Sequence, residues 1–226
     1  MTKAYLNPTV TVDIVLFTIK DDTLQVLLIN RDSEPFKAMD ALPGGYLLAG
    51  ETTESAAKRV LKEKAGIENV YIEQLYTFDE AGRDPRGPVF SVTYLALVPE
   101  HLLSESSEKN PDIQHPHWMS VKKALDKKHD IAFDHKKIIA YAKERLQGKI
   151  EYTTIGFGVL PKLFTLTQIQ QVYEIVLEKE IDKRNFRKKI DQLGFLKETK
   201  ETLSGLRQRP AKLYMLGTKS KTLQLF

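Results

Sequence analysis

Short runs rich in β-branched and aromatic residues dominate the first half of the chain. Residues 10–19 and 24–30 are two such runs, separated by the polar turn 20–23, and together they predict a β-hairpin. Residues 71–78 and 90–98 have the same character, so they predict two further strands.

Two stretches of the same region favour helices instead. Residues 53–65 are followed by Gly66, which suits the left-handed conformation that ends many helices. Residues 134–146 begin at Asp134, a residue well suited to cap a helix N-terminus. Strands interleaved with these helices predict an α+β fold for residues 1–150, in which helices cover a sheet as an α/β/α sandwich.

After residue 165 the helical period takes over. One predicted helix has its apolar face at Ile169, Val172, Tyr173, Val176 and Leu177. Thr167, with Gln170 three residues later, predicts a capping box at its start. A second helix is expected to begin after Asp182 and to end at Gly194. Its apolar stripe consists of Phe186, Ile190 and Leu193.

Two β-like runs follow these helices, at 195–202 and 212–216. Two helices and then a hairpin predict a winged helix-turn-helix domain over residues 151–226. The apolar stretch 152–164 contains glycine and proline, and it is expected to be a connector packed between the two domains.

Composition narrows the class of protein. The chain has 226 residues, 28% of them charged, and no cysteine, which excludes disulfides and thiolate metal sites. No apolar run approaches the ~20 residues that a membrane span needs, and the first ten residues lack the apolar core of a signal peptide. We therefore expect a cytoplasmic protein with no membrane partner.

The basic charge is concentrated in the last third of the chain. Residues 151–226 contain 14 Lys and Arg against 8 Asp and Glu, a formal charge of +6, whereas residues 1–150 carry −2. Such an asymmetry favours an anionic partner for the C-terminal domain, most often nucleic acid, although many basic domains are merely soluble.

The stretch from Gly45 to Ile67 resembles the Nudix box, the motif of a family of diphosphate-cleaving enzymes. The matching positions are Gly45, Glu51, Arg59, Leu61, Glu63, Gly66 and Ile67. Val60 and Lys64 stand where the box carries glutamates. An amphipathic surface helix would explain the charges of this stretch alone, but it would explain neither the preceding glycine turn nor the spacing to Glu51.

The two departures bear on catalysis. Positions 60, 63 and 64 share one face of a helix, where three carboxylates would converge on a divalent cation. Only Glu63 remains, and Lys64 brings a positive charge into that space. We therefore expect no catalytic residues and no required cofactor. The alternative is a Nudix hydrolase with relaxed metal needs, which would use Mg²⁺ with Glu51, Glu54 and Glu63.

Arg83 and Arg86 lie on a loop punctuated by glycine and proline between two predicted strands. Guanidinium groups match the oxygens of phosphate or carboxylate, although an exposed turn with solubilising charges is an equally fair interpretation. We hypothesise that Lys64 neutralises a ligand phosphate in place of the missing metal. The predicted effector-binding set is Gly44, Gly45, Glu51, Lys64, Arg83 and Arg86.

The second predicted helix of the C-terminal domain is basic at its N-terminal end, as in a recognition helix that enters the DNA major groove. A small helical bundle with solvated charges is the alternative. The side chains expected to contact mainly phosphates are Lys183, Lys188, Arg207 and Arg209, the last two on the predicted wing. Those expected to reach base edges are Arg184, Asn185 and Arg187.

Across nearly its whole length the chain resembles the Nudix-related transcriptional regulators, the NrtR-like family. The most distinctive match is the run from Asp182 to Arg187, and further matches lie at 83–87, 133–135, 160–166 and 209–214. The resemblance implies a homodimeric repressor of cofactor (NAD) or sugar catabolism genes that leaves its operator when a small molecule occupies the Nudix domain. It also implies an effector that is either ADP-ribose, which we place first, or a sugar such as a pentose.

Overall fold

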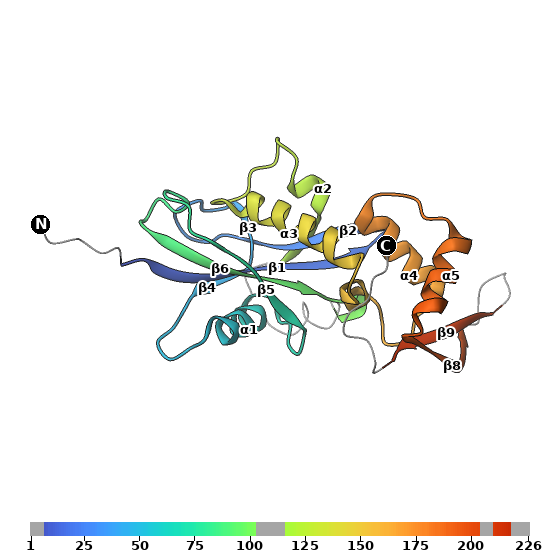
Figure 1. Cartoon of the computed structure of the whole chain (residues 1–226). Helices are drawn as coiled ribbons and strands as arrows, with labels where there is room; N and C mark the ends of the chain where they lie inside the picture. The colour runs from blue at the N-terminus through green and yellow to red at the C-terminus, as the bar shows by residue number, and fades with distance from the viewer. Residues whose placement is uncertain (1–6, 103–115, 204–209, 218–226) are drawn as a thin grey trace, which may run out of the picture.

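The computed structural model describes residues 7–102, 116–203 and 210–217. Its main element is a mixed sheet of seven strands with the order β3-β2-β1-β6-β5, in which β4 pairs with β1 and β7 with β2 (Figure 1). The strands are β1 (Thr9–Lys20), β2 (Thr23–Asn30), β3 (Asp40–Ala41), β4 (Gly44–Tyr46), β5 (Ile72–Phe78), β6 (Val89–Leu97) and β7 (His117–Ser120). The four longer strands confirm the predicted ones to within two residues at either end.

The central strand β1 has different neighbours along its two edges. One edge pairs in parallel with β6, from Thr9 to Phe17. The other edge pairs with β4 near its start and with β2 near its end, because β1 and β2 form the predicted hairpin.

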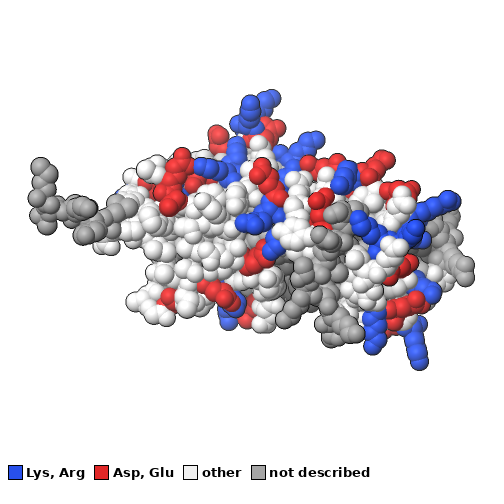
Figure 2. All heavy atoms as spheres, viewed as in Figure 1, with Lys and Arg blue, Asp and Glu red and all other residues white. Residues whose placement is uncertain are grey.

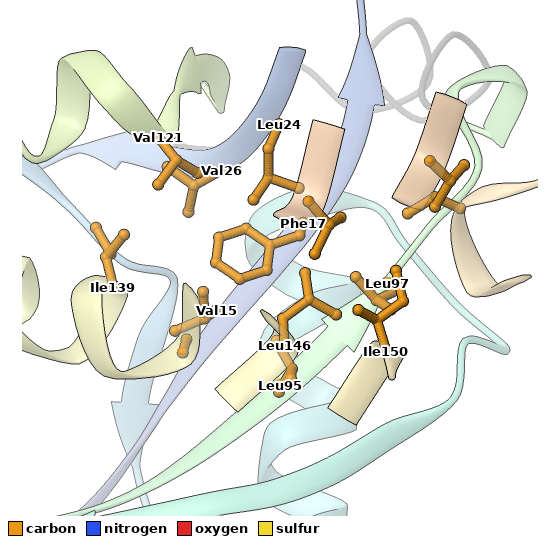
Figure 3. Close-up of a cluster of buried hydrophobic side chains, with 14 of the residues drawn as sticks. Val15, Phe17, Leu24, Val26, Leu95, Leu97, Val121, Ile139, Leu146 and Ile150 are labelled. Carbon is orange, nitrogen blue, oxygen red and sulfur yellow. The ribbon is translucent and has the colours of Figure 1, made fainter. Parts of the chain in front are cut away.

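Helices cover both faces of the sheet, which confirms the predicted sandwich (Figure 1). α1 (Thr53–Ala65) packs Val60 and Leu61 against the β1 residues that point to its face, among them Ile14. On the opposite face lie the short α2 (Val121–Ala124) and α3 (His135–Ile150). Figure 3 shows how Phe17 of β1 is enclosed there by side chains of β2, β6 and α3.

The C-terminal part is a winged helix, as predicted. It consists of α4 (Leu166–Leu177), α5 (Lys183–Leu193) and the hairpin β8 (Leu196–Leu203) with β9 (Ala211–Leu216). Tyr173 of α4 and Phe186 of α5 pack with ring centroids 5.4 Å apart in its interior. Within the part of the chain that the structure describes, no helix is long and apolar enough to cross a membrane.

The capping box of α4 lies two residues earlier than predicted. Thr165, not Thr167, is the N-cap: its hydroxyl accepts a hydrogen bond from the backbone N of Gln168, whose side chain accepts one from the Thr165 N. Both threonines are followed by glutamine three residues later, so the motif alone fits either start. The earlier start adds two residues to the helix, of which Leu166 packs against the core.

The connector joins the two parts through one continuous apolar core. It contains a 3-10 helix, η2 (Ile155–Val159), whose Phe157 ring lies 5.5 Å from both Phe164 and Phe195. Phe164 exchanges two backbone hydrogen bonds with Tyr214 of β9. The same cluster of buried residues extends from Val15 of the sheet to these rings.

Candidate functional site

A cavity of about 220 Å³ opens where several segments of the N-terminal part meet. Residues of β1 and β4, the last turn of α1, the first residue of α3 and the loops after β2 and β5 line it. Four basic side chains contribute to this lining: Arg31, Lys64, Arg83 and Arg86. These positive charges come from distant parts of the sequence and outnumber the three carboxylates of the lining, which belong to Asp13, Asp32 and Asp84. The excess of positive charge suits an anionic ligand.

Five of the six residues predicted to bind an effector line the cavity: Gly44, Gly45, Lys64, Arg83 and Arg86. Glu51 is not among the lining residues. It accepts two hydrogen bonds from Arg59, at 2.7 and 3.0 Å, and one from the backbone N of Leu48. The hydrogen bond from Arg59 lowers the pKa of Glu51. A contact of Glu51 with an effector stays a prediction.

The two glycines let the backbone of β4 approach its neighbours closely. A Cβ atom on Gly44 would lie 2.0 Å from Oδ1 of Asp13, and one on Gly45 would lie 2.9 Å from Cγ2 of Val60. Asp13 is itself buried and accepts a hydrogen bond from the Ser91 hydroxyl. A side chain at position 44 therefore requires Asp13 to move.

The remaining box residues form a structural network. Arg59 bridges Glu51 and Glu63, donating to the Glu63 carboxylate at 3.1 Å as well. The Val60 side chain is fully buried in the core between α1 and the sheet. A glutamate side chain at position 60 would therefore have to turn out of this core. Among the residues that the structure describes, no group of three His, Cys, Asp or Glu is arranged to hold a metal ion. The prediction that the chain needs no metal remains untested by a binding measurement.

The two loop arginines are held by carboxylates. Arg83 donates to both oxygens of Asp134 at 3.0 and 2.7 Å, and its side chain is only 5% exposed. Arg86 makes a bidentate pair with Asp84, the shorter contact being 2.6 Å, and is 41% exposed. This pair raises the pKa of Arg86. Arg83 thus braces the loop against α3, whereas Arg86 is open to solvent and able to meet a ligand.

The lining residues that the sequence interpretation missed include Arg31, Tyr46 and Phe133. The Arg31 guanidinium lies 4.8 Å from the ring centroid of Phe133, and that of Arg86 lies 5.5 Å from the same ring and 5.7 Å from the Tyr46 ring. Arg31 directly follows the predicted strand 24–30, and a charged residue at the end of an apolar strand could have marked it as a candidate for the site. Nothing in the sequence places Phe133 beside it.

His135, the first residue of α3, makes contacts that suit a structural role. Its Nδ1 accepts a hydrogen bond of 2.9 Å from the backbone N of Leu42. Burial lowers the pKa of His135, so the ring stays neutral in the folded chain. Its Nε2 lies 3.7 Å from Oδ1 of Asp13, at the floor of the same cavity.

The N-terminal half of α5 presents the predicted DNA-contacting residues to solvent. Asp182 caps the helix by accepting a hydrogen bond of 2.8 Å from the Asn185 backbone N, and Phe186 and Ile190 anchor its inner face. The exposed side chains are Lys183, Arg184, Asn185, Arg187 and Lys188. Figure 2 shows Lys and Arg side chains projecting from this end of the molecule. Arg207 and Arg209 lie outside the described residues.

A Nudix sheet with a basic cavity, followed by a winged helix with an exposed basic face, defines a two-domain class of protein. Residues 7–142 match the NUDIX domain family, and residues 156–216 match the NrtR DNA-binding winged helix domain. The ADPR responsive transcriptional repressor NtrR of Acinetobacter baylyi is 37% identical over 93% of this chain and 82% of its own. The chain therefore belongs to the NrtR family of transcriptional repressors.

Solved structures support the same assignment. Shewanella oneidensis NrtR complexed with a 27mer DNA superposes with a TM-score of 0.82 and 36% identity, covering 92% of this chain and 93% of that one. The Nudix domain of the same protein complexed with ADP ribose gives a TM-score of 0.53, over 63% of this chain and 90% of that one. The Nudix part also resembles an enzyme: the ADP-ribose pyrophosphatase of Methanocaldococcus jannaschii is 34% identical over 61% of this chain and 74% of its own.

Proposed function

We propose that this chain is a transcriptional repressor that binds operator DNA through α5 and is released when ADP-ribose occupies the cavity of the Nudix part. The observation that carries the proposal is the presence, in one chain, of an exposed basic recognition helix and a separate basic cavity. The Shewanella protein that shares both parts was crystallised with DNA, and its Nudix domain with ADP ribose.

The DNA-binding half of the proposal rests on geometry and charge. In this proposal the exposed Lys183 and Lys188 contact phosphates. Arg184, Asn185 and Arg187, which are also exposed, reach base edges. The chain acts as a homodimer in this proposal, because two recognition helices about 34 to 36 Å apart can enter successive major grooves on one face of DNA. A repressor of this kind works in the cytoplasm, beside the chromosome.

The effector half rests on the chemistry of the cavity. ADP-ribose carries a diphosphate, which suits the basic side chains, and an adenine and riboses, which suit the Tyr46 and Phe133 rings. Genes of NAD cofactor metabolism are the targets that this effector suggests, since ADP-ribose is NAD without its nicotinamide. The four basic side chains favour ADP-ribose over the alternative pentose effector, which lacks the phosphates.

A hydrolase is the second candidate function, favoured by the resemblance to the pyrophosphatase. The buried Val60 and the half-buried Lys64 oppose it, because they occupy box positions that would carry metal-binding carboxylates. Glu63 is the single box glutamate of that helix face, and it pairs with Arg59. Binding without turnover is the function that this site supports better.

Fluorescence anisotropy tests both halves together. The full chain is titrated onto a labelled duplex from the intergenic DNA upstream of its own gene, with and without ADP-ribose. We expect salt-dependent binding that ADP-ribose weakens. Lack of binding to that duplex, or no effect of ADP-ribose on it, contradicts the proposal. A parallel incubation of ADP-ribose with the chain and Mg²⁺ or Mn²⁺ should leave the nucleotide intact, and rapid cleavage would favour the hydrolase.

A further inference from the structure

The four basic side chains of the cavity differ in what holds them. Arg83 and Arg86 each form a bidentate pair with a carboxylate. Arg31 instead donates to backbone carbonyl oxygens, from Nε to Pro35 at 2.9 Å and from Nη2 to Ser33 at 3.2 Å. Carbonyl groups orient a guanidinium without supplying a full negative charge, and the Arg31 guanidinium also feels the charges of Asp32 and Asp84 and the opposing charge of Arg86.

The loop around Arg31 is built to keep this side chain in place. Phe36 and Ala38 within it, and Phe133 beside it, all have positive φ, at 66°, 65° and 56°. Such backbone conformations are costly for residues other than glycine and cluster at binding sites. The Phe133 ring, also packed edge-on against Phe36 at 4.9 Å, is the surface on which the Arg31 guanidinium lies.

Lys64 reaches the same cavity from α1. It is half-buried, and the charge of Arg31 acts on it together with the opposite charges of Asp32 and Glu63. Burial, with a smaller effect of the Arg31 charge, lowers the pKa of Lys64, although Asp32 and Glu63 act in the opposite direction. Burial and the charge of Arg86 likewise lower the pKa of Arg31. Holding like charges together in a partly desolvated cavity is unfavourable, and an anion bound between them relieves the repulsion.

We propose that Arg31 and Lys64 bind the diphosphate oxygens of the effector directly, so that this cavity recognises its ligand without a divalent cation. This inference rests on the proposed function, in which ADP-ribose occupies the cavity. It gives Lys64 the role that a bridging metal ion would have at the same box position. It also makes Arg31 a specificity-determining residue and Arg83 a positioning residue, because the Arg83 side chain is held by Asp134.

Isothermal titration of the full chain with ADP-ribose tests the inference. We expect the same Kd, within about twofold, in EDTA and in Mg²⁺. Lys64→Met should weaken binding about tenfold or more, the usual effect of losing a hydrogen bond to a charged group, while Lys64→Arg should stay close to wild type. Arg31→Lys, which keeps a charge but loses the stacked fork, should weaken binding severalfold.

Lys62→Met is the matched control, because Lys62 lies on the same helix, is exposed and does not line the cavity. Binding of DNA by each variant without ADP-ribose shows that it is folded. Wild-type binding that requires Mg²⁺, or a Lys64→Met variant that binds like Lys62→Met, overturns the inference and leaves the proposed function intact. If the wild type binds no ADP-ribose in either buffer, both the inference and the proposed function are overturned.

Discussion

At the scale of single residues, His135 couples the floor of the cavity to pH. The charged groups that act on it are Asp13, Asp134, Arg83 and Arg31, and burial is the largest influence. Its pKa in the folded chain lies below the ordinary 6.5. Between these two values the unfolded chain binds a proton that the folded chain does not, so stability falls as pH drops below about 6.5, by at most about 1.4 kcal/mol per pH unit for one group.

Replacing His135 with Asn should reduce this dependence. The amide oxygen can accept the hydrogen bond from the Leu42 backbone N, but the side chain does not titrate. Chemical unfolding at pH 8 and at pH 5 should show a smaller loss of stability for His135→Asn than for the wild type. Equal losses in both proteins would contradict the neutral, buried histidine.

A substitution at Gly44 tests whether β4 must approach Asp13 closely. Gly44→Ala should cost roughly 1–3 kcal/mol of unfolding free energy, since the new methyl group displaces Asp13 or the strand, and should abolish ADP-ribose binding. Gly148→Ala is the control: Gly148 is exposed in α3 and has open space around it, so alanine there should stabilise by roughly 0.5–1 kcal/mol. Calorimetry of both variants separates local crowding from loss of glycine as such.

At the scale of elements, α5 should divide its side chains between affinity and sequence preference. Lys183→Ala with Lys188→Ala should weaken binding to all DNA and reduce the slope of log K against log salt by about 1.8 for each subunit bound. Arg184→Ala with Arg187→Ala should cost roughly 1–3 kcal/mol for each base contact and narrow the gap between operator and unrelated DNA.

Charge alone must be excluded as the cause of these effects. Lys58→Ala with Lys62→Ala removes two positive charges from α1, where both lysines are exposed and belong to surface ion pairs that contribute little to stability. This variant should bind DNA like the wild type. Anisotropy titrations over a range of salt concentrations measure all three proteins, and ADP-ribose affinity should be unchanged in each of them.

Elements with a strong periodic signal were predictable from sequence, and short ones were not. The β1–β2 hairpin and α4 follow from periodicity. α1 and α5 follow from periodicity together with their C-terminal glycines, Gly66 and Gly194. β3, β4 and β7 have two to four residues each, and they exist because β1 and β2 offer them edges to pair with. The same limit applies to the cavity. Lys64 was predicted from a motif, whereas Arg31 and Phe133 meet only through folding.

At the scale of the molecule, the strand β1 reaches from the cavity to the winged helix. Thr11 and Asp13 of β1 line the cavity, whereas Ile19 and Lys20 at its other end share a groove with Gln168 and Gln171 of α4. The connector helix η2 packs beside this end, with Gly158 so close to β6 that a Cβ would lie 2.9 Å from Leu97 Cβ. A shift of the sheet on ligand binding would therefore reach the winged helix through packed contacts.

The Phe157 ring is the centre of that contact, so Phe157→Leu should weaken the communication more than either site. The substitution costs roughly 1–3 kcal/mol of stability through the space it leaves, yet removes no residue of the cavity or of α5. ADP-ribose can release DNA only by its different affinity for two states of the protein, an effect of typically 5- to 150-fold in such systems. In the Phe157→Leu variant, the ratio of the DNA affinities measured without and with ADP-ribose should fall to about twofold.

Phe78→Leu is the matched control, because Phe78 is a buried phenylalanine of β5 that packs against Tyr76 and Tyr141 instead of the connector. The Phe78→Leu variant should lose stability but keep the wild-type ratio of DNA affinities without and with ADP-ribose. Coupling is reciprocal, so DNA must weaken ADP-ribose binding by the same factor that ADP-ribose weakens DNA binding, and titration calorimetry with and without duplex provides an independent value. A Phe157→Leu variant with the wild-type ratio, or a Phe78→Leu variant that loses it equally, would show that the signal does not pass through the connector.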